Sequence, residues 1–301
     1  MLDDVWVDLF DPDAATLKRH LPPGMHSTFI DRILAPAGED VRPRLDTLRT
    51  YVFGVLVVPI ITSDNLDTVF HEVDVIMTSS TLITIRKSLP GCRPWRVDAI
   101  REGALRDEPT PGGCFHRLLD DVAERYLAFV DGVDGEIDEL EDEVEHWTAA
   151  RIRERISALR HEILHVRRAL TPTRDIARAV LDDRVELETA DLFPREIEIH
   201  VADTYDKLLR AADGLELSRD LLAGVRDYHQ AQVAQDQNEV MKKLAAVGSM
   251  LLLPTLIVGF YGQNLKDVPE FDWSFGYEWS WFLIIATTVA QFVYFRRKGW
   301  L

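Results

Sequence analysis

Cysteine is scarce in this chain. Its 301 residues include 2 cysteines, Cys92 and Cys114, and neither belongs to a CxxC motif or a Cys/His cluster. The sequence therefore predicts neither a disulfide framework nor a zinc site built on cysteines, and it fits a reducing compartment. The first residues, Met1 to Asp4, are acidic and are not followed by an apolar run. We therefore expect no signal peptide before the N-terminal domain.

Basic residues are in the minority. The chain has 34 Lys and Arg against 51 Asp and Glu, which gives a formal net charge of -17. A nucleic-acid partner is disfavoured, because binding to phosphate backbones depends on Lys and Arg. A cationic partner suits this charge better. Phosphate-binding loops are also missing, since the sequence contains neither GxGxxG nor GK[ST].

Long uncharged runs occur only near the C-terminal end. Residues 244–261 and 279–295 lack charged side chains, and each run is just long enough to cross a hydrocarbon core of about 30 Å as a helix. Lys and Arg flank the pair on its outer sides, whereas the intervening loop, 262–278, is mainly acidic. This pattern predicts two membrane spans, contact with the lipid bilayer, and both termini in the cytoplasm of a multi-pass inner (plasma) membrane protein. The alternative is a pair of buried core helices.

The N-terminal part has the pattern of an α/β domain. Residues 5–10 predict a short strand, and residues 13–20 and 25–34 predict short helices. Runs rich in Val, Ile, Thr and Phe at 45–61 and 69–86 predict the strands of a small mixed sheet. The pair Ser79-Ser80 fits a tight connection between the last two strands.

Helical patterns dominate from residue 115 onward. Residues 131–145 hold nine acidic residues and no Lys or Arg, which fits either a solvated face or a collar that concentrates cations. The next predicted helix, 151–185, contains His161-Glu162-Ile163-Leu164-His165, an HExxH pattern in which two imidazoles share one helix face. Nearby arginines oppose a bound dication, so we interpret the pattern as helix surface or packing rather than a metalloprotease site.

A third predicted helix is unusually long. It begins after residues 191–194 and, if helical to residue 260, spans about 100 Å at 1.5 Å per residue. Such a helix needs partner helices, so we expect an oligomer. The predicted divisions are an α/β domain at 1–110, a helical hairpin at 111–192, a stalk helix continuing into the first span at 193–261, an external loop at 262–278, and a second span with a basic tail at 279–301.

Several segments resemble one family. The segment Asn238-Glu239-Val240-Met241-Lys242, the turn Tyr261-Gly262-Gln263-Asn264 with the following Val268-Pro269-Glu270, and the ending Arg296-Arg297-Lys298-Gly299-Trp300-Leu301 are similar to the CorA-like divalent-metal transporters. Residues 203–206 and 219–228 resemble the stalk helix of that family, and residues 51–53 and 77–85 resemble its α/β domain. One departure is Gln263, which stands where the family usually has Met. It puts magnesium specificity in question.

The resemblance implies a non-enzymatic, channel-like transporter: a homopentamer whose stalk helices surround a central pore. Mg²⁺ would be the substrate and a possible regulatory ligand. The selectivity loop would consist of Tyr261, Gly262, Gln263 and Asn264. Mg²⁺ sheds its waters reluctantly, so the amides of Gln263 and Asn264 would hydrogen-bond its hydration shell.

Helical periodicity defines one stripe that, with the resemblance, we interpret as pore-lining: Asn238, Met241, Leu244 or Ala245, Gly248, Leu252, Thr255 and Gly259. Its apolar middle would form a hydrophobic gate at Met241 and Leu244. Asp227 would form a carboxylate ring at the cytoplasmic exit. Asp203 and Asp64 are the predicted regulatory metal ligands. Helix packing is an alternative role for the stripe, because it contains small residues.

Two functional alternatives remain open at this stage. One is transport of Zn²⁺, or of Co²⁺ or Ni²⁺, by a protein of the same family. The other is a membrane-anchored coiled-coil scaffold that conducts nothing. An anchor, however, has no need for an amide-bearing turn after the first span.

Overall fold

A computed structural model describes residues 5–38, 41–62, 67–92, 94–144, 146–188, 190–263, 270 and 273–301. The chain forms two compact units, Met1–Arg226 and Asp227–Leu301. The boundary between them falls inside one helix, α6 (Arg195–Tyr261). Each unit has its own pattern of burial, and the difference between the two patterns bears on function.

The first unit is built on a five-stranded mixed sheet with the order β1-β5-β4-β3-β2. The strands are β1 (Trp6–Phe10), β2 (Arg44–Thr47), β3 (Val52–Ile61), β4 (Thr68–Met77) and β5 (Leu82–Arg86). β1 pairs with β5 in parallel, and the other neighbours are antiparallel. Branched and aromatic side chains favour these strands because they pack well on a pleated surface. The predicted mixed sheet is confirmed.

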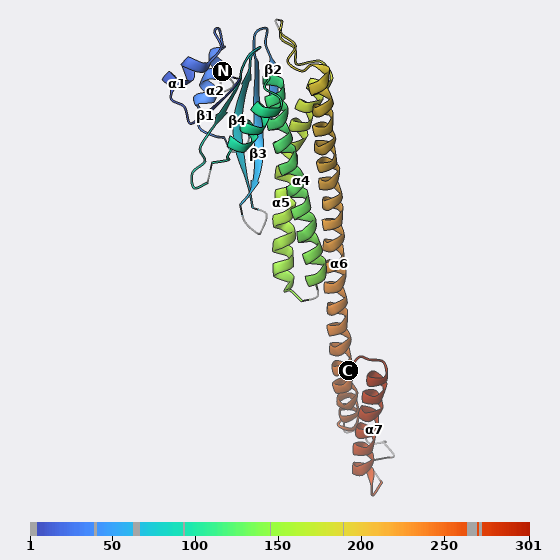
Figure 1. Ribbon diagram of the computed structural model, residues 1–301. Coiled ribbons are helices and arrows are strands. Elements are labelled where there is room, and N and C mark those ends of the chain that lie inside the picture. The colour runs from blue at the N-terminus through green and yellow to red at the C-terminus, as the bar shows by residue number, and fades with distance from the viewer. Residues whose placement is uncertain are drawn as a thin grey trace. The chain divides into compact units, whose positions relative to one another are not determined.

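Two short helices, α1 (Ala14–His20) and α2 (Ser27–Leu34), cover one face of the sheet (Figure 1). The Asp13 side chain accepts a hydrogen bond from the backbone N–H of Thr16 at 2.8 Å, which caps the start of α1. Leu17 of α1 and Ile33 of α2 are buried against Phe53 and Ile85 of the sheet. Both helices lie where the sequence predicted them.

The other face of the sheet packs against long helices. These are α4 (Pro111–Glu143) and α5 (Ala149–Leu181), and the first part of α6 joins the same core. The fully buried Tyr126 of α4 donates its hydroxyl to the backbone oxygen of Val57 at 3.1 Å, which fixes α4 to β3. Residues of α4, α5 and α6 thus share one continuous core with the sheet. The predicted combination of an α/β domain with long helices is confirmed.

Three details differ from the sequence prediction. A helix that was not predicted, α3 (Asp98–Asp107), precedes α4, and α4 itself begins at Pro111 rather than near residue 115. Helix α5 ends at Leu181, earlier than the predicted residue 185, and it continues through Pro172. The start of α4 depends on Thr110, whose hydroxyl oxygen accepts a hydrogen bond from the N–H of Gly113 at 3.1 Å.

The second unit contains the remainder of α6 and helix α7 (Gly276–Arg297). The Gln291 side-chain amide of α7 donates to the backbone oxygen of Ser249 in α6 at 3.2 Å. Among the described residues of this unit, only His229 and Ala246 are buried. Helix α6 contains an 18-residue window long and apolar enough to cross a membrane, with a mean hydropathy of 1.9 and 6% of its residues buried.

Candidate functional site

The predicted selectivity loop begins where α6 ends. The helix closes with Tyr261, and the N–H groups of Gly262 and Gln263 donate to the backbone oxygens of Val258 and Phe260 at 2.9 and 3.3 Å. The Gln263 side chain is exposed. Asn264 lies outside the described residues, so its role stays a prediction.

The predicted pore stripe lies along the C-terminal half of α6. Met241, Leu244 and Leu252 are all exposed, and Leu252 retains 70% of its accessible surface. Gly248 is half-buried, whereas Asn238, Thr255 and Gly259 are exposed. The Thr255 hydroxyl donates to the backbone oxygen of Leu251 at 2.7 Å. Seen in one chain, this stripe is therefore an uncovered, largely apolar helix face.

Three carboxylates were predicted at the pore exit or as regulatory metal ligands. Two of them lie on α6, and the third lies outside the described residues. Asp227 and Asp203 are both exposed on α6. The residue after Asp203, Thr204, is buried, and its hydroxyl donates to the Asp120 carboxylate at 3.0 Å. Asp64 falls in the segment 63–66, which is not described. The Asp203–Asp64 pairing therefore stays a prediction.

The HExxH residues lie on α5. The rings of His161 and His165 have centroids 6.1 Å apart, and His165 packs edge-on against Phe70 at 4.6 Å. Burial raises the pKa of the Glu162 carboxyl above its usual range. Among the described residues, no third acidic, thiol or imidazole group joins this histidine pair at ligand distance. The predicted packing role of His165 is supported by its contact with Phe70.

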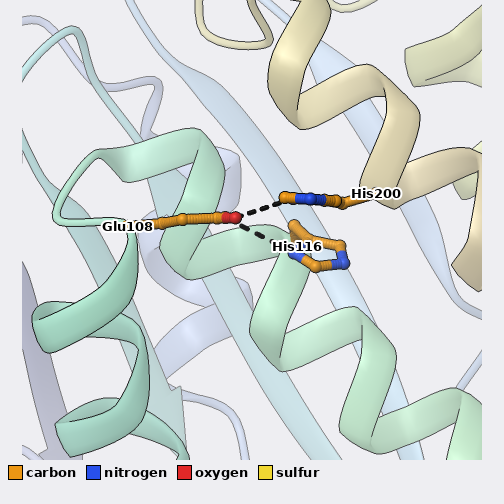
Figure 2. A group of neighbouring side chains, drawn as sticks. All are labelled: Glu108, His116 and His200. Carbon is orange, nitrogen blue, oxygen red and sulfur yellow. Dashed lines mark ion pairs between the residues drawn. The ribbon is translucent and has the colours of Figure 1, made fainter.

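A different histidine pair converges on a carboxylate (Figure 2). Glu108 follows the C-terminal end of α3, His116 lies in α4, and His200 lies in α6. The Glu108 Oε1 atom is 2.7 Å from His200 Nδ1, and its Oε2 atom is 3.6 Å from His116 Nδ1. Sequence reasoning missed this cluster because its members are far apart in the chain and form no motif. No local signal identifies it.

A second cluster consists of charges buried within the sheet domain. Lys87 Nζ lies 2.9 Å from Glu72 Oε1 and 3.2 Å from Asp74 Oδ2, while Arg32 approaches both carboxylates more distantly. Asp74 is fully buried, and this burial raises its pKa to about 6 although Lys87 and Arg32 oppose the shift. Glu72 also lines a cavity of about 410 Å³ together with Phe70, His165 and others.

The fold is that of an α/β domain joined to a long helix, and solved structures share it. The complete structure of the CorA magnesium transporter from Methanocaldococcus jannaschii superposes with a TM-score of 0.77 at 21% identity, covering 99% of this chain and 92% of that one. At this level of identity the likeness establishes the fold.

Family membership follows from the sequence match. Residues 3–297 match the CorA-like Mg²⁺ transporter protein family, and the chain belongs to it. It is similar to the cobalt/magnesium transport protein CorA of Thermotoga maritima, with 26% identity over 92% of this chain and 77% of that protein. It is also similar to the putative metal ion transporter YfjQ of Bacillus subtilis, with 27% identity over 86% of this chain and 78% of that protein. The protein is thus a member of a divalent-cation transporter family and not of an enzyme family.

Proposed function

We propose that this chain carries a divalent cation, Mg²⁺ before others, across the plasma membrane through the central pore of a homopentamer. The observation that carries the proposal is the uncovered face of α6, which runs from Asn238 to Gly259 and leads to the exposed Gln263, the residue before Asn264 in the sequence. Family membership supports the cation as substrate.

The exposed apolar surface of the second unit supports the proposed membrane arrangement. The second unit exposes leucines, valines and aromatic residues along both α6 and α7. Water would make such a surface costly, because each exposed Å² of apolar area forgoes about 25 cal/mol of burial energy. Contact with lipid and with neighbouring copies of the chain would remove this apolar surface from water. We infer two spans, with α7 (Gly276–Arg297) as the second and both termini in the cytoplasm.

The uneven chemistry of the stripe supports the pore assignment. Asn238 at one end and Thr255 near the other are polar, whereas Met241, Leu244 and Leu252 between them are apolar. A ring of such side chains around a narrow pore expels water and so acts as a gate. Asp227, further toward the first unit along α6, supplies a carboxylate for each copy at the cytoplasmic exit.

The ion is selected, in this proposal, by neutral oxygens at the pore mouth. Mg²⁺ is bound through its waters by amide carbonyls better than by a close-fitting charged cage, since it dehydrates reluctantly. Gln263 and Asn264 provide such carbonyls in each copy. The cobalt named for the Thermotoga maritima relative and the Gln at position 263 make Co²⁺ and Zn²⁺ the competing substrates. Asp203 and Asp64 of neighbouring copies remain our proposed regulatory ligands.

The test is ion-resolved flux into proteoliposomes that contain the purified full-length protein. Asn264→Ala should lower Mg²⁺ influx at least about tenfold, equivalent to about 1.4 kcal/mol in the barrier, because it removes the carbonyl that orients the hydration shell. Ser280→Ala, a polar truncation in the second turn of α7, is the control and should leave influx near the parent value. Parallel runs with Co²⁺ and Zn²⁺ identify the preferred ion.

Normal Mg²⁺ influx in Asn264→Ala, with the oligomer intact by size-exclusion chromatography, would refute the pore-mouth assignment. No influx of any of the three ions in the parent protein would instead favour the non-conducting scaffold.

A further inference from the structure

We propose that Glu108, His116 and His200 form a binding site for a divalent transition-metal ion of the Zn²⁺ type, within the first unit and independent of the proposed pore. Three separate elements supply the ligands: the end of α3, the second turn of α4 and the beginning of α6. The inference does not depend on transport, because it concerns binding by residues that the pore does not use.

The distances suit one ion. The candidate ligand atoms of the three side chains all lie within 4.8 Å of one another. Ligands at 2.0–2.2 Å around a tetrahedral Zn²⁺ are separated by about 3.3–3.6 Å. The distance of 3.6 Å between His116 Nδ1 and Glu108 Oε2 already has this length. The distance of 2.7 Å between His200 Nδ1 and Glu108 Oε1 needs to widen by less than about 1 Å. Figure 2 shows the carboxylate pointing toward both rings.

Two of the ligand atoms lack hydrogen-bond partners. His116 keeps only 7% of its surface exposed, and both its Nδ1 atom and the Oε2 atom of Glu108 are buried without a hydrogen bond. A buried polar atom left unpaired costs about 1–3 kcal/mol, and a bound cation would satisfy both atoms at once. Burial also lowers the pKa of His116, although Glu108 and Asp120 oppose the shift. The neutral imidazole keeps the lone pair that a metal needs.

The backbone around Glu108 is shaped to admit the carboxylate. A Cβ atom at Gly113 would lie 2.6 Å from the Glu108 Cβ and 3.0 Å from its Oε2, too close for any other residue at this position. The N–H of Gly113 donates a hydrogen bond to the Thr110 hydroxyl oxygen, which holds Gly113 in place. The first turn of α4 therefore accommodates Glu108 beside His116 only because residue 113 has no side chain.

The two helices that carry the histidines are held together next to the cluster. Asp120 lies one turn after His116 on α4, and Thr204 lies one turn after His200 on α6. The Thr204 hydroxyl and Lys207 Nζ both donate to Asp120, at 3.0 and 2.8 Å. These bonds fix the spacing of the histidines, so an ion meets a site whose scaffold is already in place.

The ligand set selects the class of ion. Two imidazoles and one carboxylate favour Zn²⁺, Co²⁺ or Ni²⁺, whereas Mg²⁺ prefers oxygen ligands in an octahedron. The side chain of His200 is 47% exposed, so an ion can reach the cluster from solvent and keep water as a further ligand. Bound metal would tie α3 and α4 to α6 and would stabilise the first unit by mass action.

The experiment uses the full-length protein in detergent, stripped of metal by chelation. Zn²⁺ titration by calorimetry and metal analysis after gel filtration should give one equivalent per chain at this site. Co²⁺ should give the visible absorption typical of four- or five-coordinate nitrogen and oxygen ligation, and a large excess of Mg²⁺ should not displace it. The melting temperature should rise with Zn²⁺.

The diagnostic variant is His200→Ala, because its partly exposed side chain can be removed without opening the core. It should weaken Zn²⁺ binding at least tenfold and abolish the Co²⁺ spectrum. The matched control is His161→Ala with His165→Ala, which removes two histidines outside the cluster and should retain both signals. Asn264→Ala should retain them too, which separates this site from the pore mouth.

Three outcomes would overturn the proposal. They are a parent protein that binds no stoichiometric Zn²⁺, a His200→Ala variant that binds like the parent, and a site from which Mg²⁺ displaces Co²⁺. The first would indicate that the cluster is only a hydrogen-bonded Glu–His pair. Any of them can occur while Mg²⁺ influx remains normal, so this proposal and the transport proposal fail separately.

Discussion

The two units of this chain differ in whether their apolar side chains are buried or exposed. In the first unit they are inside: Trp6, Phe53 and Phe115 are fully buried between the sheet and its helices. In the second unit they are outside, as Leu252 and Leu256 show with 70% and 68% of their surface exposed. The first unit is thus stabilised by the apolar surface that it buries away from water. The second unit needs another phase or another copy to cover its surface.

The polar groups differ in the same way. The first unit buries charges and pairs them, as Lys87 does with Glu72 and Asp74. In the apolar part of the second unit, hydroxyls bond back to their own helix, as Thr255 and Thr288 do with Leu251 and Ile284. A helix whose polar groups are satisfied internally is the structure that lipid tolerates. The comparison therefore distinguishes a unit with a buried apolar core and paired charges from a unit whose surface suits a membrane.

The largest effect should come from emptying the core of the first unit. Phe53→Ala removes a fully buried ring and should lower the free energy of unfolding by about 3–5 kcal/mol. Phe282→Ala removes an exposed ring from α7 and should change the free energy of unfolding of the first unit by less than about 0.5 kcal/mol. Thermal unfolding of both variants in detergent measures the difference. Equal losses would mean that the two units unfold as one.

The next prediction concerns the second unit, where a charge is added to the exposed apolar surface. Leu256→Lys places a charge on the exposed apolar face of α6, where a bilayer would make it cost about 2.5–3.5 kcal/mol. We expect the membrane-inserted yield to fall severalfold. The control, Leu164→Lys, changes an exposed leucine of α5 and should be tolerated. Membrane fractionation with quantitative blotting reads both, and a normal yield of Leu256→Lys would place this face away from lipid.

How much could be predicted from the sequence depends on the range of the interactions. The runs that became β3 and β4 were predictable because Val and Ile favour strands over any short window. The apolar end of α6 was predictable because 18 uncharged residues are a local property. Helix α3 was not, since its Asp98–Asp107 segment has a weak apolar pattern and its N-cap residue, Val97, makes no side-chain cap bond.

The histidines make the same point about sites. His161 and His165 share a turn and so formed a visible motif, yet one of the rings packs against Phe70 rather than aiming at a third ligand. His116 and His200 formed no motif, but the packing of α4 against α6 brings both to Glu108. Sequence spacing reports neighbours along one helix, whereas ligand sets arise from contacts between elements. That information is absent from a single sequence.

The smallest expected effect concerns the buried charges of the first unit. Asp74 has a pKa raised to about 6, mainly by burial, and Glu72 beside it adds to the shift. Between about pH 4 and pH 6 the folded protein therefore keeps a proton that the unfolded chain releases. The contribution of this group to stability is full below pH 4 and is lost as the pH rises through 6.

Asp74→Asn removes this titration. Relative to the parent, the variant should gain stability as the pH rises from 4 to 7, by no more than about 3 kcal/mol for a shift of about two pKa units. Melting temperatures of both proteins across that range measure the gain. Asp46→Asn, which removes a partly exposed carboxylate from β2, controls for the loss of a charge. If the Asp74→Asn and parent curves stay parallel from pH 4 to pH 7, Lys87 and Arg32 hold Asp74 ionised, and the buried charges of the first unit are fully compensated.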